Sequence, residues 1–206
     1  MCLALIAPLL LLSNSACAVE IEGIKLPSRV QIGAAGSDLA LNGAGVRSRF
    51  IFKVYVAALY LSAPTEDGES ILRSDEPRRF VMYLLRDLSA KQINASIGDA
   101  LRETLTPAER RPLDARMARF NAIFETMREV KEGTRITLDY LPALGTVVSV
   151  NSEEKDRIPG RDFNQALLRV WLGERPRDPG LRKALLGFGT KETEKQETGR
   201  FSRDQR

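Results

Sequence analysis

A cationic and a phenolic side chain, Arg47 and Tyr55, lie close together in a stretch that is otherwise largely apolar and β-rich (41–61). This stretch is too apolar to be a solvated surface strand, so the guanidinium is expected to be buried at least in part. A buried unpaired charge is costly, whereas the forked donors of arginine suit a carboxylate or phenolate, and a tyrosine hydroxyl can share that anion. The alternative is that Arg47 pairs internally with one of the 27 acidic residues.

The strands that must position these groups are indicated by alternating apolar residues. We expect short strands at 19–22 and 30–32, two longer strands within 39–61, and another at 80–85. Gly43 and Gly45 would permit a bulge or bend in this region and the close approach of another group. Residues 134–140 and 146–150 form the clearest predicted hairpin.

Helix-start signals occupy the gaps between the strands. Ser89 begins a capping box and therefore a helix. A second start follows at 106–109, and Pro112 interrupts that helix, so its main part is expected to begin there. Further helices are expected around 163–171 and after Asp178, where a proline follows a capping residue.

This order of strands, helices, a hairpin and further helices predicts an α+β fold with a largely antiparallel sheet packed against helices. The chain has 206 residues, which is enough for one domain with a substantial core. We assign that domain to residues 19–188. Residues 189–206 are polar and charged, and we predict that they form a disordered tail.

The N-terminal segment has the pattern of a secretory signal peptide. Residues 1–18 carry no charge and contain an apolar run at 3–12, followed by the small residues Ala16-Cys17-Ala18. This pattern predicts cleavage before Val19. The apolar run is too short to span a bilayer, so we expect a periplasmic protein with no transmembrane segment after signal removal.

Both cysteines, Cys2 and Cys17, fall inside this leader, and the chain has no histidine. The mature protein is therefore predicted to lack disulfides, a cysteine nucleophile, a His-assisted serine and the usual zinc or copper ligands. No acidic cluster has the pattern of a calcium loop. We expect neither a metal nor a cofactor.

The net charge of +4 is modest and is spread along the chain. The densest basic group lies at 110–128, where arginines alternate with acidic residues as they do on a solvated helix face. Basic residues are not interleaved with aromatic ones. We therefore expect no nucleic-acid partner.

Two blocks of the sequence resemble the chalcone isomerase-like family. The first contains Gly43-Ala44-Gly45-Val46-Arg47 and the run 52–61; the second contains Phe163, 166–168, 171–174, Pro176, Asp178, Leu181 and 185–187. Both blocks lie in the family's order, and the resemblance covers about residues 20 to 188. It implies an open-faced β-sandwich with a ligand cleft between the sheet and the helices.

The resemblance implies two possible activities, of which one is catalytic. In the family's enzymes, an arginine matching Arg47 holds an aryloxide while it adds to an enone, and polar side chains order a water and the substrate carbonyl. At the four positions that align with the enzymes' polar catalytic side chains, this sequence has Tyr55, Ser89, Ala95 and Val170. Most of the catalytic set is therefore replaced, unless Asn94 supplies an asparagine in a shifted register.

The other activity implied by the resemblance is fatty-acid binding, in which an arginine and a tyrosine hold the carboxylate. Arg47 and Tyr55 match that pair better than the enzyme set. The candidates for the wall around the ligand's tail are Phe50, Phe52, Ile97, Phe120, Phe124 and Trp171. Each of these apolar side chains has core packing as its alternative role.

We therefore expect a non-catalytic binding protein for a small amphipathic acid such as a fatty acid. The first alternative is an isomerase (an intramolecular lyase) that acts on a chalcone-like phenolic enone. The second alternative is a scaffold that binds another protein through the open face of the sheet. The sequence specifies neither the ligand's chain length nor the oligomeric state.

We predict that the exported protein begins near Val19 and contains no thiol, because cleavage there removes both cysteines. Intact mass spectrometry of the protein purified from its host, combined with thiol titration, measures this. A mass that retains residues 1–18, or that includes a lipid on Cys17, would contradict the prediction.

Overall fold

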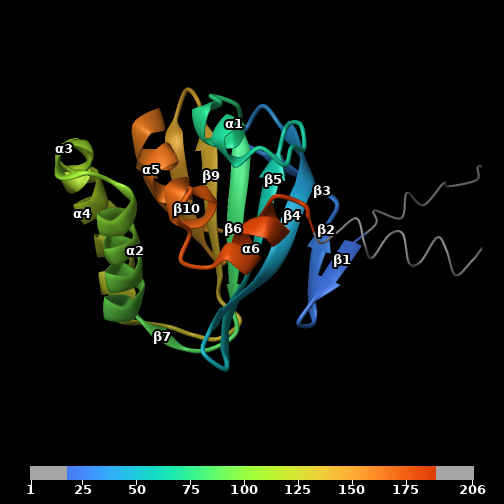
Figure 1. The fold of residues 1–206 in the computed structure, drawn as a ribbon, viewed down its shortest axis with the longest axis horizontal. Coiled ribbons are helices and arrows are strands. Elements are labelled where there is room, and N and C mark those ends of the chain that lie inside the picture. The colour runs from blue at the N-terminus through green and yellow to red at the C-terminus, as the bar shows by residue number, and fades with distance from the viewer. Residues whose placement is uncertain (1–17, 189–206) are drawn as a thin grey trace, which may run out of the picture.

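One antiparallel sheet of seven strands, in the order β11-β10-β9-β6-β5-β4-β3, forms the centre of the fold (Figure 1). A computed structural model of the protein describes residues 18–188, so the predicted tail and all but the last residue of the predicted leader, 1–18, lie outside the described part. The sheet strands are β3 Arg29–Ile32, β4 Ser37–Arg49, β5 Phe52–Leu61, β6 Arg78–Leu84, β9 Arg135–Leu141, β10 Gly145–Val150 and β11 Glu153–Ile158. Each neighbouring pair is antiparallel, as predicted.

Two small strand pairs and six α-helices complete the described chain. The pairs are β1 Ala18–Ile21 with β2 Ile24–Pro27, and β7 Leu88–Ser89 with β8 Glu129–Val130. The helices are α1 Gly68–Arg73, α2 Ala90–Thr104, α3 Pro107–Arg110, α4 Asp114–Met127, α5 Arg161–Leu172 and α6 Pro179–Leu185, with a 3₁₀ turn, η1 Arg111–Leu113, before α4. The predicted α+β class is confirmed. Within residues 18–188, no helix is long and apolar enough to cross a membrane.

The predicted helix starts are present at the expected residues. The Ser89 hydroxyl accepts from the Gln92 backbone N–H, and the Gln92 side chain accepts from the Ser89 N–H, which completes a capping box at α2. Thr106 and Glu109 form the same arrangement at α3. Pro112 lies in η1, and the main helix, α4, begins directly after this turn.

The two faces of the sheet bury separate apolar clusters. On one face, β5, β6 and β9 pack against α2, α4, α5 and α6. On the opposite face, Leu26 of β2 packs in a smaller cluster with Val56 and Tyr60 of β5. The face that the sequence predicted to be open is therefore covered in part by the β1–β2 pair.

Helix α1 and strand β11 were not predicted from the sequence. Asp67 caps helix α1 by accepting from the backbone N–H groups of Glu69 and Ser70. Strand β11 has the sequence Glu-Glu-Lys-Asp-Arg-Ile, and it pairs only with β10 at the edge of the sheet. An exposed edge strand does not need an apolar face, so its sequence shows no alternation.

A buried arginine, Arg78 at the start of β6, joins the sheet to two helices. Its side chain donates to the Asn164 amide oxygen of α5 at 2.9 Å and to the Ile71 carbonyl of α1 at 2.6 Å. Arg78 is 2% exposed, and burial lowers its pKa to about 10. It stays protonated at neutral pH, and carbonyl and amide oxygens satisfy the charge.

Helix α6 packs directly against the backbone of β4 at the two glycines that precede Arg47. A Cβ on Gly43 would lie 2.7 Å from the Leu185 carbonyl oxygen and closer still to that of Ala184. A Cβ on Gly45 would lie 2.7 Å from the Cβ of Ala184. The expected close approach to a glycine backbone is therefore the contact of a helix with a strand.

We predict that Gly43→Ala lowers the free energy of unfolding by about 1–3 kcal/mol, because the new methyl group meets backbone atoms that cannot move independently. Gly98→Ala in α2 is the matched control. Its Cβ would meet only an arginine side-chain nitrogen at 3.5 Å, so we expect no loss or a gain of up to about 1 kcal/mol from helix propensity. Urea denaturation of the two variants checks this, and equal effects would contradict the packing argument.

Candidate functional site

A cavity of about 210 Å³ lies between the helix-covered face of the sheet and helices α2, α4 and α5. The residues that line it are Arg47, Arg49, Phe50, Phe52, Val54, Tyr55, Met82, Leu84, Arg86, Leu88, Gln92, Ile93, Ser96, Ile97, Phe124, Ile136, Val170 and Trp171. Phe50 and Phe52 are well exposed, which places the mouth of the cavity beside the β4–β5 turn. The inner wall is apolar, and it is formed by side chains that belong to the main core.

Trp171 connects the apolar wall to the polar end of the cavity. Its ring packs against Phe80, with 4.3 Å between the ring centroids. Its indole N–H donates to the Tyr55 hydroxyl oxygen at 2.7 Å. The indole is therefore held in place by ring packing, and its only hydrogen-bond donor is used by Tyr55. This bond fixes the orientation of the Tyr55 hydroxyl.

The Tyr55 hydroxyl is a neutral donor at the polar end of the cavity. Burial raises the pKa of Tyr55 to about 12, against smaller opposing effects of the Trp171 hydrogen bond and the Arg47 charge. The phenol is therefore protonated at neutral pH. Its oxygen accepts from Trp171, and its own proton has no acceptor among residues 18–188, so it is free to donate to a ligand.

Arg47 lies opposite Tyr55 in the β4–β5 ladder and pairs with an acidic residue of the chain. One terminal nitrogen, Nη1, donates to the Asp178 Oδ2 at 3.0 Å and to the Ser48 carbonyl at 2.7 Å. The two side chains of the ion pair are 23% and 22% exposed. The alternative left open by the sequence, internal pairing of Arg47, is therefore present.

The pairing of Arg47 is incomplete. Its Nε and second terminal nitrogen have no hydrogen-bond partner within the described residues. Asp178 is also occupied elsewhere, because its Oδ1 caps α6 by accepting from the Leu181 N–H at 2.9 Å. A guanidinium with unused donors thus lies beside the cavity, but its charge is largely balanced.

Seven of the eight side chains predicted for a ligand site line this one cavity. They are Arg47, Phe50, Phe52, Tyr55, Ile97, Phe124 and Trp171. Phe120 is the exception: it is fully buried and packs between Phe124 and Phe163, at centroid distances of 5.3 and 6.2 Å. It lies one helical turn from Phe124, and its role in the structure is core packing, the alternative noted for it.

The positions aligned with the enzymes' polar residues offer little chemistry to the cavity. The Ser89 hydroxyl is used in the α2 capping box, Ala95 is exposed outside the cavity, and Val170 is an apolar lining residue. Asn94 donates toward α4, to the Asn121 carbonyl at 3.2 Å, so the shifted register does not bring an asparagine into the cavity. Within residues 18–188, no group of acidic or cysteine side chains could hold a metal.

Three charged residues of this site were not predicted from the sequence. Asp178 was expected only as a helix cap, although a cap whose second oxygen faces a strand is a suitable partner for an arginine. Arg49 and Arg86 line the mouth of the cavity. In the sequence, Arg49 was marked only by its position next to the aromatic residues Phe50 and Phe52. Arg86 belongs to a separate segment in which no sequence pattern indicated a ligand site.

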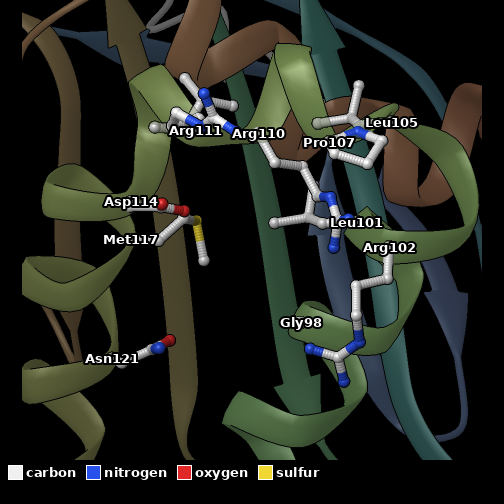
Figure 2. Close-up of a pocket in the computed structure, with 11 residues that line it drawn as sticks. Gly98, Leu101, Arg102, Leu105, Pro107, Arg110, Arg111, Asp114, Met117 and Asn121 are labelled. Carbon is white, nitrogen blue, oxygen red and sulfur yellow. The ribbon is translucent and has the colours of Figure 1, made fainter.

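A second cavity, of about 410 Å³, lies between α2 and the α3–η1–α4 segment (Figure 2). Figure 2 shows Arg102 on the α2 side, Arg110 and Arg111 across the top, and Asp114 and Asn121 on α4. These groups make the walls mainly polar. The second cavity therefore lacks the apolar inner wall that characterises the first one.

The comparisons with known proteins agree with this geometry. A family model described as chalcone isomerase-like matches residues 18–187. The chain belongs to this family. The family assignment and the fold expected from the resemblance are both confirmed.

The fold of this chalcone isomerase-like protein is similar to the crystal structure of a fatty-acid binding protein from Arabidopsis thaliana. The TM-score is 0.64 and the sequence identity is 15%, over 82% of this chain and 95% of the plant chain. At that identity the similarity shows the shared fold. No curated protein matches the sequence.

Proposed function

We propose that this chalcone isomerase-like protein binds a fatty acid or a similar small amphipathic acid in the smaller cavity and catalyses no reaction. The observation that carries the proposal is an apolar chamber that ends at a protonated tyrosine and a partly paired arginine. A neighbour with the same fold is a fatty-acid binding protein, which supports the proposal.

The head group would bind to the two groups at the polar end. The Tyr55 hydroxyl donates one hydrogen bond, and the unused Nε and Nη2 of Arg47 offer a second, charge-assisted contact. Asp178 lies beside this position and reduces the net attraction for an anion. Recognition would therefore depend on hydrogen-bond geometry more than on net charge.

The tail would lie in the apolar chamber, where each buried methylene contributes about 0.8 kcal/mol. The cavity volume of about 210 Å³ is below the roughly 300–1,000 Å³ usual for drug-sized ligands. A long chain would therefore extend from the chamber toward the mouth. Phe50 and Phe52 would provide apolar contacts for the part that extends.

An isomerase is the second candidate because Arg47, the residue that matches the aryloxide-binding arginine of the enzymes, lines a cavity. Binding is favoured over catalysis because of the residues at the other positions that align with the enzymes' polar groups. There, Ser89 is used in a helix cap, Ala95 is exposed and Val170 is apolar. A protein scaffold has less support, since part of the second sheet face is covered by β1–β2. A periplasmic location, inferred from the leader, is part of the same proposal.

We predict opposite effects for the two partners of the ion pair on the binding of dodecanoate. Asp178→Asn keeps the cap but removes the competing charge, so affinity should rise by about five- to tenfold. Arg47→Gln removes the charged donors, so affinity should fall by about tenfold or more. Isothermal titration calorimetry at neutral pH measures both changes.

Dodecanol is the matched control ligand, because it has the same tail and no anionic head group. Neither substitution should change its affinity by more than about twofold, since the tail contacts are unaffected. If acid and alcohol respond equally to both substitutions, Arg47 has a structural role alone. If neither ligand binds the wild-type protein, the proposed function is wrong.

We predict that cyclisation of a chalcone by this protein is undetectable above the uncatalysed rate, because the positions aligned with the enzymes' polar residues hold a capping serine, an exposed alanine and an apolar valine. Absorbance of the chalcone over time, with and without protein, measures this. A rate enhancement that disappears in Arg47→Gln would instead establish the isomerase.

A further inference from the structure

The turn between β4 and β5 exposes three large apolar side chains in succession. Phe50 is 89% exposed, Ile51 87% and Phe52 55%, and the other large apolar residues exposed within 18–188 are Leu144 and Phe188. Single exposed apolar residues are ordinary, but a contiguous group at the end of a hairpin indicates an interaction site. We call residues 50–52 the apolar tip.

The backbone of the apolar tip holds an aromatic residue where a smaller residue is usual. Phe50 has φ of 56°, in the left-handed region that favours glycine or asparagine in hairpin turns. A non-glycine residue there costs about 1–2 kcal/mol. Solvent exposure of the ring provides no folding energy in return, so packing within the domain does not explain the phenylalanine.

The surroundings of the apolar tip are cationic. The guanidinium carbon of Arg49 lies 6.0 Å from the centroid of the Phe50 ring. That of Arg86 lies 5.2 Å from the centroid of the Phe52 ring. Neither arginine has an ion-pair partner among residues 18–188. The nearby Lys53 is neutralised by Glu22 at 2.7 Å, whereas the two arginines beside the aromatic rings have no such partner.

The apolar tip is continuous with the mouth of the cavity. Arg49, Phe50, Phe52 and Arg86 all line it, whereas Ile51 is exposed and is not among the lining residues. In Figure 1 the turn projects from the lower end of the sheet, beyond β7. A flat surface that contacted the tip would therefore lie directly across the entrance to the apolar chamber.

We propose that the apolar tip docks on an anionic phospholipid surface. Phe50 and Ile51 enter the interface between head groups and acyl chains, and Arg49 and Arg86 bind the lipid phosphates. Apolar side chains flanked by free cations are the combination that anionic bilayers attract. An amphipathic ligand can then pass between the bilayer and the cavity without crossing water.

A second copy of the chain fits this surface less well. Two tips in contact would bring four unpaired arginines together, and like charges oppose such an interface. The tip comprises three residues, whereas a stable protein interface buries about 1,200–2,000 Å² and involves about 20–30 residues on each side. A lipid surface needs no such area, because it surrounds the inserted side chains.

Co-sedimentation with extruded vesicles of phosphatidylglycerol and phosphatidylcholine tests the proposal. The wild-type protein should bind, and the double variant Phe50→Ser/Ile51→Ser should lose about tenfold or more of its partition coefficient. Arg49→Gln and Arg86→Gln should each lose about fivefold on anionic vesicles and nothing on pure phosphatidylcholine. Leu144→Ser, at the β9–β10 turn on the opposite end of the sheet, is the matched control and should bind as the wild type does.

Vesicle binding that is absent in the wild type, or that is equal in all variants, would overturn the proposal. So would a dimer, seen by analytical ultracentrifugation, that dissociates in the Phe50→Ser/Ile51→Ser variant. The inference goes beyond the proposed ligand and is tested separately from it. Calorimetry with dodecanoate in the absence of vesicles reports on the cavity alone, so failure of one assay leaves the other result intact.

Discussion

Close packing of α6 on the glycine backbone of β4 determines the geometry of the candidate site. Without side chains at Gly43 and Gly45, the helix approaches the strand until its backbone meets it, and the amide of Asn42 donates to the Leu185 carbonyl at 2.8 Å. This contact places the N-cap of α6 beside Arg47. The cap residue, Asp178, then uses one oxygen for the helix and the other for the arginine.

The consequence is a polar end with donors but little net charge. Tyr55 is held by Trp171 and kept protonated by burial, while Asp178 balances most of the charge of Arg47. A cavity of this kind can orient a head group, but the positions aligned with the enzymes' water-ordering and carbonyl-binding groups hold Ser89, Ala95 and Val170. In this member of the family, the first of these residues is used for capping, the second is exposed and the third is apolar.

Much of the site was predictable because its signals were local. The glycine pair and Arg47 lie within five residues of one another, and the Ser89 cap involves a residue three positions further on, so each motif could be recognised in the sequence. The partner of Arg47 lies 131 residues away, and spacing could not select it from the 27 acidic residues. The most buried arginine among the described residues is Arg78. Its hydrogen-bond acceptors are carbonyl and amide oxygens, so reasoning that looked for an anion beside a buried cation did not predict it. Phe120 and Phe124 share one helix face, and only the packing of α5 separates them.

The central claim is that a fatty acid occupies the cavity beneath α2 and α5, and Trp171 offers the most direct measurement. It is the only tryptophan in the chain, and it lines this cavity but not the one between α2 and α4. A fatty acid brominated along its chain quenches an indole that it contacts. The account predicts saturable quenching of Trp171 with the same dissociation constant that calorimetry gives. Binding by calorimetry without quenching would place the ligand elsewhere and contradict the account.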